Sequence, residues 1–144
     1  MTLEASLSLS LFIHAANIGF MLMFTVVVAP AVFKVLSQKA AASYLRVLFP
    51  RLFMFGFATS SIATISSLFD SGILITVISA VIAFGFLFNA VILTPKINQF
   101  RDKSITGEVA AEKAFARLHL FSVAIFGSQF FASLYLIISQ TYFN

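Results

Sequence analysis

Four long stretches without a single Asp, Glu, Lys or Arg constrain this chain more than any other feature. They cover residues 5–33, 52–69, 71–95 and 118–144. A helix of about 20 apolar residues crosses the ~30 Å hydrocarbon core of a bilayer, and each stretch has or approaches that length. A helix also satisfies its backbone hydrogen bonds internally, as lipid requires. The sequence therefore predicts an all-α integral membrane protein with four transmembrane helices.

The composition excludes a soluble domain. Hydrophobic residues make up 60% of the chain, charged residues make up 10%, and the mean hydropathy is +1.04. Soluble domains carry about 25% charged residues, so this chain lacks the polar surface to face water. The absence of cysteine excludes disulfides and thiolate chemistry. We expect residues 1–144 to form one bundle with short loops and spans near residues 7–30, 52–69, 73–94 and 119–141.

The basic residues predict the orientation. All nine fall in two segments between spans: Lys34, Lys39, Arg46 and Arg51 in the first, and Lys96, Arg101, Lys103, Lys113 and Arg117 in the second. The positive-inside rule places these segments in the cytoplasm and both termini outside, and we expect a bacterial inner membrane. This topology accounts for the net charge of +4, so the expected partner is the lipid bilayer and not nucleic acid.

The second basic segment has its own pattern. Four charged residues recur there at helical spacing, namely Glu108, Glu112, Lys113 and Arg117. They predict a short amphipathic extension before the fourth span, separated from the third helix by a break at Thr106-Gly107. We expect Pro95 to end the third helix, and Pro30 to kink or end the first.

Small residues form a stripe on two spans. The second span carries Gly56, Ser60 and Ala63, and the fourth carries Ala124, Gly127, Ser128 and Ala132. Small side chains let helices approach closely in lipid. We expect both stripes to pack inside the bundle; the alternative is that one forms an interface in a homo-oligomer or a larger membrane complex.

Polar residues inside the spans are the candidates for function. His14 and Asn17 share a helix face, and Ser61, Thr64, Ser79 and Ser133 are expected at a similar depth in the outer half. A neutral imidazole is a common metal ligand, so this cluster predicts a metal or small-ligand site with His14 as the metal-binding residue. The alternative is a histidine hydrogen-bonded between helices for packing.

A second candidate group lies toward the cytoplasmic end. Asn89, His119 and Ser122 are candidate ligand-binding residues, and Arg51 and Arg117 are candidates for contact with a lipid phosphate. The alternative is ordinary interfacial anchoring. The two histidines are expected about 20 Å apart along the membrane normal, so they cannot share one haem or metal ion.

Several ordered motifs resemble the transmembrane protein 205-like family, also called domain of unknown function 4149. They are His14 to Gly19 followed by Ala29-Pro30 to Lys34, then Leu48-Phe49-Pro50, then Asn89 to Pro95, and finally Phe115, Arg117, His119 and Ser122. One departure is that Ser128 and Gln129 stand where the family commonly has an asparagine. The resemblance implies a four-helix membrane protein, with a eukaryotic member linked to resistance to platinum drugs.

Three functional hypotheses follow. No acidic residue lies inside a span and no catalytic constellation is visible, so a non-enzymatic protein is favoured. The first hypothesis is a metal-ion or small-solute binding or transport-associated protein. The alternatives are a structural or assembly subunit of a membrane complex, and a haem-binding redox protein with His14 as the single axial ligand. No cofactor is predicted beyond that haem alternative.

Overall fold

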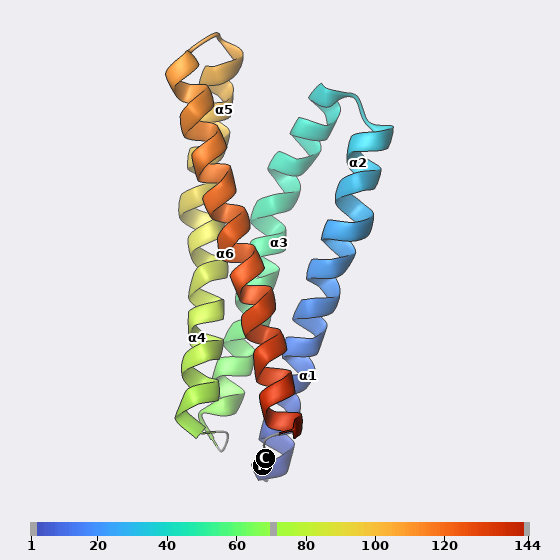
Figure 1. Cartoon of the computed structure of the whole chain (residues 1–144), viewed down its shortest axis with the longest axis vertical. Coiled ribbons are helices and arrows are strands. Elements are labelled where there is room, and N and C mark those ends of the chain that lie inside the picture. Colours follow the sequence, from blue (N-terminus) through green and yellow to red (C-terminus); the bar gives the residue numbers. More distant parts are fainter. Residues whose placement is uncertain (1–2, 70–71, 143–144) are drawn as a thin grey trace.

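The computed structural model describes residues 3–69 and 72–142, with side chains described for residues 9–69 and 72–140. Within these residues the chain is helical almost throughout. The elements are α1 (Leu3–Leu22), the π-helix η1 (Met23–Val28), α2 (Ala29–Val35), α3 (Gln38–Ser67), α4 (Gly72–Phe88), the π-helix η2 (Asn89–Leu93), α5 (Thr94–Ile105) and α6 (Val109–Tyr142). Since α1–η1–α2 and α4–η2–α5 are each continuous, they and the single helices α3 and α6 make four long helical stretches (Figure 1).

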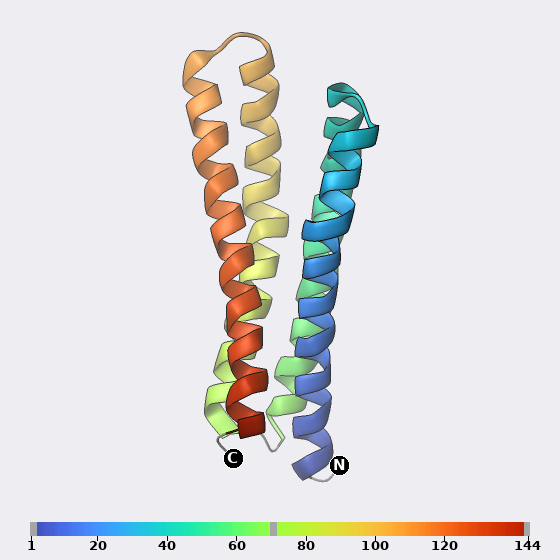
Figure 2. The same cartoon turned by 45° about the vertical axis from the view of Figure 1, so that its right-hand side comes forward.

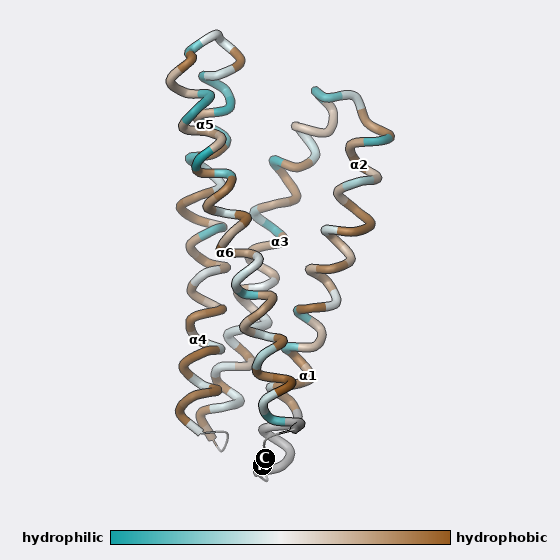
Figure 3. Tube along the Cα trace, viewed as in Figure 1, coloured by the Kyte–Doolittle hydropathy of each residue, from teal (hydrophilic) through white to brown (hydrophobic). Residues whose placement is uncertain are grey.

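All four stretches are long and apolar enough to cross a membrane. These candidate spans are Leu9–Val35, Gln38–Ser67, Gly72–Ile105 and Val109–Gln140. The hydrophilic residues gather around α5 and the adjoining turns, at the end of the bundle away from both termini (Figure 3). The predicted all-α bundle of four transmembrane helices is therefore confirmed.

Neither Pro30 nor Pro95 ends its helical stretch, so the prediction that Pro95 ends the third helix is wrong. Both prolines lie toward the end of the bundle that carries the basic residues, which we call the basic end. The N–H of Thr94 bonds to the carbonyl of Asn89, and that of Ala29 bonds to the carbonyl of Phe24, each five residues back. A proline lacks an N–H and clashes with the carbonyl four residues before it. The wider π-turn directly before each proline lets the helix continue, and the first helix reaches Val35 beyond Pro30.

Most of the segment expected to connect the first two spans, between residues 30 and 52, is also helical. The hydroxyl of Ser37 accepts a hydrogen bond from the N–H of Ala40 at 3.4 Å, and α3 begins at the next residue, Gln38. Such an N-cap satisfies an otherwise unpaired backbone donor. Pro50 lies inside α3. The basic residues therefore stand on helix ends and not on loops, and the predicted spans were too short at this end.

The connection between α5 and α6 has the break that the sequence predicts at Thr106-Gly107. Helix α5 ends at Ile105, and Gly107 has a φ of +93°, a left-handed conformation that glycine adopts without strain. Helix α6 then begins at Val109 and runs without a break into the fourth span.

The small-residue stripe of α3 packs inside the bundle. Gly56, Ser60 and Ala63 are buried, and a Cβ added to Gly56 would lie 2.6 Å from Cε1 of Phe86 on α4. Phe86 is fully buried in the core. Gly56 is therefore what allows α3 and α4 to approach closely.

The stripe of α6 does not pack in this way. Ala124 and Ser128 are exposed, and a Cβ added to Gly127 would meet no atom within 4 Å. The prediction that this stripe packs inside the bundle is wrong for these three residues. The other helices leave Ala124 and Ser128 uncovered.

The bundle is closed near the termini and open at the basic end. Helix α6 packs against α1, but neither η1 nor α2 contacts it. The first helical hairpin consists of α1–η1–α2 and α3, and the second consists of α4–η2–α5 and α6. The two hairpins diverge toward the end that carries α2 and α5 (Figures 1 and 2).

Candidate functional site

His14 connects three helices in the closed half of the bundle. It is fully buried, with Nε2 at 2.9 Å from Oγ of Ser79 on α4 and Nδ1 at 3.2 Å from Oγ of Ser133 on α6. A neutral imidazole has one N–H donor and one acceptor, so the two hydroxyls satisfy both ring nitrogens. A metal ion or haem iron at His14 would have to replace one of these partners.

Asn17 makes a second connection one turn away, between α1 and α3. Its Nδ2 donates to Oγ of Ser60 at 3.0 Å, and its Oδ1 accepts from Oγ1 of Thr59 at 2.7 Å. Ser61 and Thr64, which were expected in this cluster, instead donate to carbonyls of their own helix at 2.8 Å. The expected outer cluster is thus two separate sets of interhelical hydrogen bonds.

Two further polar contacts hold α6 to the third helical stretch. Oγ of Ser122 donates to Oδ1 of Asn89 at 2.7 Å, and Nδ2 of Asn89 donates to the carbonyl of Ser122 at 3.4 Å. Nε2 of Gln129 donates to the carbonyl of Ile82 at 2.8 Å. Gln129 therefore makes a polar contact between α6 and α4.

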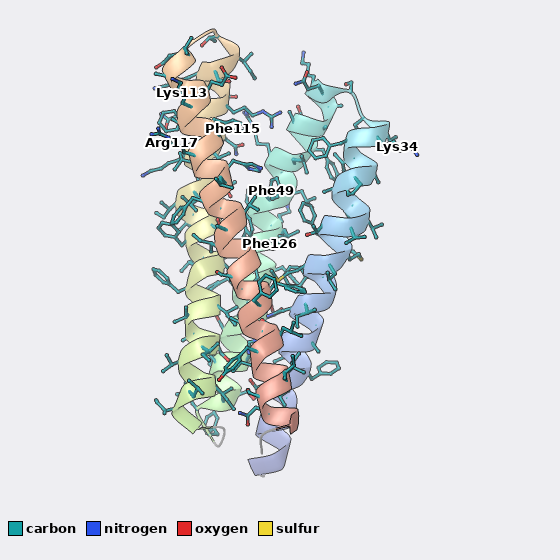
Figure 4. All side chains as sticks on the ribbon, viewed as in Figure 1. Lys34, Phe49, Lys113, Phe115, Arg117 and Phe126 are labelled. Atoms are coloured by element: carbon teal, nitrogen blue, oxygen red, sulfur yellow. The ribbon has the colours of Figure 1, made fainter. Side chains whose placement is uncertain are left out.

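A cleft of about 610 Å³ lies between the diverging hairpins. We call it the aromatic cleft, because seven phenylalanines from three helical stretches line it. They are Phe24, Phe33, Phe49, Phe53, Phe115, Phe126 and Phe130. Phe49 on α3 and Phe126 on α6 both line the cleft, and Phe115 lies nearer the basic end (Figure 4).

Polar side chains line the cleft mainly toward its basic end, and we call this set the basic mouth: Arg46, Asn98, Arg101 and His119. Arg46 on α3 forms an ion pair with Asp102 on α5, which links the two hairpins there. Cζ of Arg101 lies 6.0 Å from the centroid of the Phe115 ring, and the His119 ring stacks on the same Phe115 ring with centroids 5.9 Å apart.

The candidate site residues predicted from the sequence do not lie together in the structure. His119 and Ser122 line the aromatic cleft, whereas His14, Asn17 and Asn89 are buried between helices away from it. The two candidate phosphate contacts, Arg51 and Arg117, are exposed and do not line the cleft.

Sequence reasoning missed Arg46 and Arg101 as lining residues. Arg46 was assigned to a loop, although the Ser37 cap signal places it on a helix. From that start Arg46, Phe49 and Phe53 follow one another at helical spacing on one face. Recognising the cap would have placed Arg46 next to the cleft aromatics.

Four apolar helices, held by buried hydrogen bonds at one end and opening into an aromatic cleft at the other, define a helical integral membrane protein. The chain belongs to the family described as domain of unknown function DUF4149, whose model matches residues 12–105. The match includes His14, Asn17 and both arginines of the basic mouth, and it ends before α6. No curated protein and no solved structure matched the chain.

Proposed function

We propose that this chain is a non-enzymatic membrane protein that binds a small, mainly apolar molecule in the aromatic cleft. The observation that carries the proposal is the cleft itself, whose volume of about 610 Å³ lies in the range of small-molecule sites. Its lining is apolar along most of its length and polar at the basic mouth, as binding sites for oriented ligands are. The resemblance to the transmembrane protein 205-like family stays a prediction, and the proposal does not depend on it.

A small molecule fits the geometry better than a metal ion or haem at His14. Both ring nitrogens of His14 are engaged, and His14 does not border the cleft. Within residues 9–69 and 72–140 there is no group of three or more His, Cys, Asp or Glu side chains that could hold a metal ion. His14 is thus better placed to join helices than to bind a ligand.

Filling the cleft is expected to remove the bound molecule. Gly127 lines the cleft and has open space at its Cβ position, so Gly127→Phe adds a ring there without a backbone clash. Gly19→Phe is the matched control, because Gly19 also has open space but does not line the cleft. Native mass spectrometry from a mild detergent should show a co-purified adduct on the parent and on Gly19→Phe, but not on Gly127→Phe.

The same spectra test a second candidate function, a structural or assembly subunit. It is favoured by the uncovered α6 face with Ala124 and Ser128, since small residues support close helix contacts in lipid. A homo-oligomer or a partner mass without a small adduct would favour this second function. An adduct present at the same level on all three proteins would contradict binding in the cleft.

We also propose that the basic end faces the cytoplasm of a bacterial inner membrane, with both termini outside. The positive-inside rule supports this, since all nine Lys and Arg residues lie in the half of the bundle remote from the termini. Because the chain has no cysteine, single cysteines report topology without background. An impermeant thiol reagent should label Ser71→Cys on intact cells and Thr106→Cys only in inverted vesicles; the reverse pattern would refute this orientation.

A further inference from the structure

The aromatic cleft opens sideways, toward the space that lipid occupies. No Cα atom of η1 or α2 lies within 8 Å of a Cα atom of α6, so these two edges of the cleft are not packed against each other. Phe33 on α2 and Val123 on α6 both line it, and they are 67% and 51% exposed. A molecule dissolved in the surrounding leaflet therefore has a lateral path into the cleft.

The length of the cleft fits a leaflet. On α6 its lining residues run from Phe115 to Phe130, which corresponds to about 22 Å at 1.5 Å per residue. One leaflet contributes about half of a ~30 Å hydrocarbon core. A single occupant can thus reach from the apolar interior, at Phe126 and Phe130, to the headgroup region, at the basic mouth.

The charge at the mouth favours an anion. Arg46 is paired with Asp102, but Arg101 has no acidic partner among the described side chains. Two guanidinium groups against one carboxylate leave the mouth with a net positive charge. The planar guanidinium fork matches the oxygens of a phosphate group, and basic pockets between transmembrane helices on the cytoplasmic side bind anionic headgroups.

We infer that the aromatic cleft binds an anionic phospholipid of the leaflet at the basic end. Its phosphate lies at Arg101 and Arg46, and an acyl chain lies along the phenylalanines. The inference rests on the proposed function and names the class of molecule that the cleft selects. Arg101 contributes the larger part of the selectivity, because Arg46 shares its charge with Asp102.

Tryptophan quenching by brominated lipids tests this directly. The chain has no tryptophan, so Phe126→Trp places one reporter in the cleft, and Phe131→Trp, at a 68% exposed position outside the cleft, places a control on the lipid-facing surface. Both proteins are reconstituted in vesicles of dioleoylphosphatidylcholine that contain either dibrominated phosphatidylglycerol or dibrominated phosphatidylcholine. We expect the brominated anionic lipid to quench the cleft reporter at least about threefold more effectively, and the two lipids to quench the surface reporter equally.

Charge-removing variants then locate the headgroup. In the Phe126→Trp background, Arg101→Gln should reduce the preference for phosphatidylglycerol to near one. The matched controls Arg51→Gln and Arg117→Gln remove exposed charges outside the cleft and should leave the preference unchanged. An Arg101→Gln variant that retains the full preference would overturn the inference.

The inference and the proposed function fail in different ways. Equal quenching of the cleft reporter by both brominated lipids, at the level of the surface reporter, would refute anionic selectivity and leave the cleft as a site for apolar chains. Quenching of the cleft reporter by neither lipid, with normal quenching at Phe131→Trp, would show that no acyl chain enters the cleft and would refute the lipid inference, whereas loss of the proposed function additionally requires that the native mass spectra show no adduct that depends on Gly127.

Discussion

Replacing His14 with alanine is expected to lower the free energy of unfolding by about 2–4 kcal/mol. The variant loses the contacts to Ser79 and Ser133 and leaves a cavity where α1, α4 and α6 meet. Interhelical hydrogen bonds in membranes contribute about 0.6 kcal/mol each, whereas truncating a large buried side chain costs about 2–5 kcal/mol. The serine hydroxyls can also turn back to carbonyls of their own helices, so the cavity dominates. Unfolding in mixed micelles with increasing dodecyl sulfate, followed by circular dichroism, measures the change.

His119→Ala is the matched control for this experiment. His119 is exposed and its described ring contact is the stack on Phe115, so its loss should cost less than about 1 kcal/mol. Equal destabilisation by the two substitutions would contradict the assignment of His14 as the connection between three helices.

Gly56→Ala is expected to destabilise the bundle by about 1–3 kcal/mol although it adds only one methyl group. The new Cβ would stand 2.6 Å from the ring of Phe86, which is fully buried. That ring cannot move freely, because it packs against Phe20 and Phe126 with centroids 6.0 and 6.3 Å away. Overpacking of a tight core forces backbone shifts of this energetic size. The midpoint of the same dodecyl sulfate titration should fall.

Gly127→Ala is the opposite case and serves as its control. Its Cβ would enter open space, and replacing glycine by alanine inside a helix normally stabilises by about 0.5–1 kcal/mol. The two Gly→Ala variants should therefore shift the midpoint in opposite directions. A neutral Gly56→Ala would mean that α3 and α4 do not approach as closely as described.

The fold was predictable from the sequence because hydrophobicity alone marks the four spans. The helix ends were not, because the charged residues that close the apolar stretches do not end the helices. Lys34 and Arg46 stand on helical turns, where long basic side chains reach the headgroup region while the backbone stays helical. The effect of Pro95 was missed for a related reason, since a widened turn before the proline is not visible in composition.

The candidate site was predictable only in part. Ser79 and Ser133, which contact His14, were among the residues expected at its depth, whereas the partners of Asn17 were not, because the spacing within one helix does not give its rotation relative to another. Ser60 and not Ser61 meets Asn17 for this reason. The aromatic cleft could not be predicted at all, since it arises from the divergence of two hairpins and not from any local pattern.

The two π-helical segments determine where the chain can lose a residue without a change in helix orientation. A π-turn holds one residue more than the α-helical hydrogen bond spans, and one residue corresponds to a rotation of about 100°. The π-turn absorbs this extra residue, so deleting one residue from Met23–Val28 would restore α-helical hydrogen bonds and leave Phe33 and His14 in nearly the same orientation relative to each other, whereas the same deletion in an α-helical segment would turn the residues beyond it by about 100°. Met23–Val28 and Asn89–Leu93 are therefore the places where the chain can lose one residue without turning the cleft lining relative to the closed core.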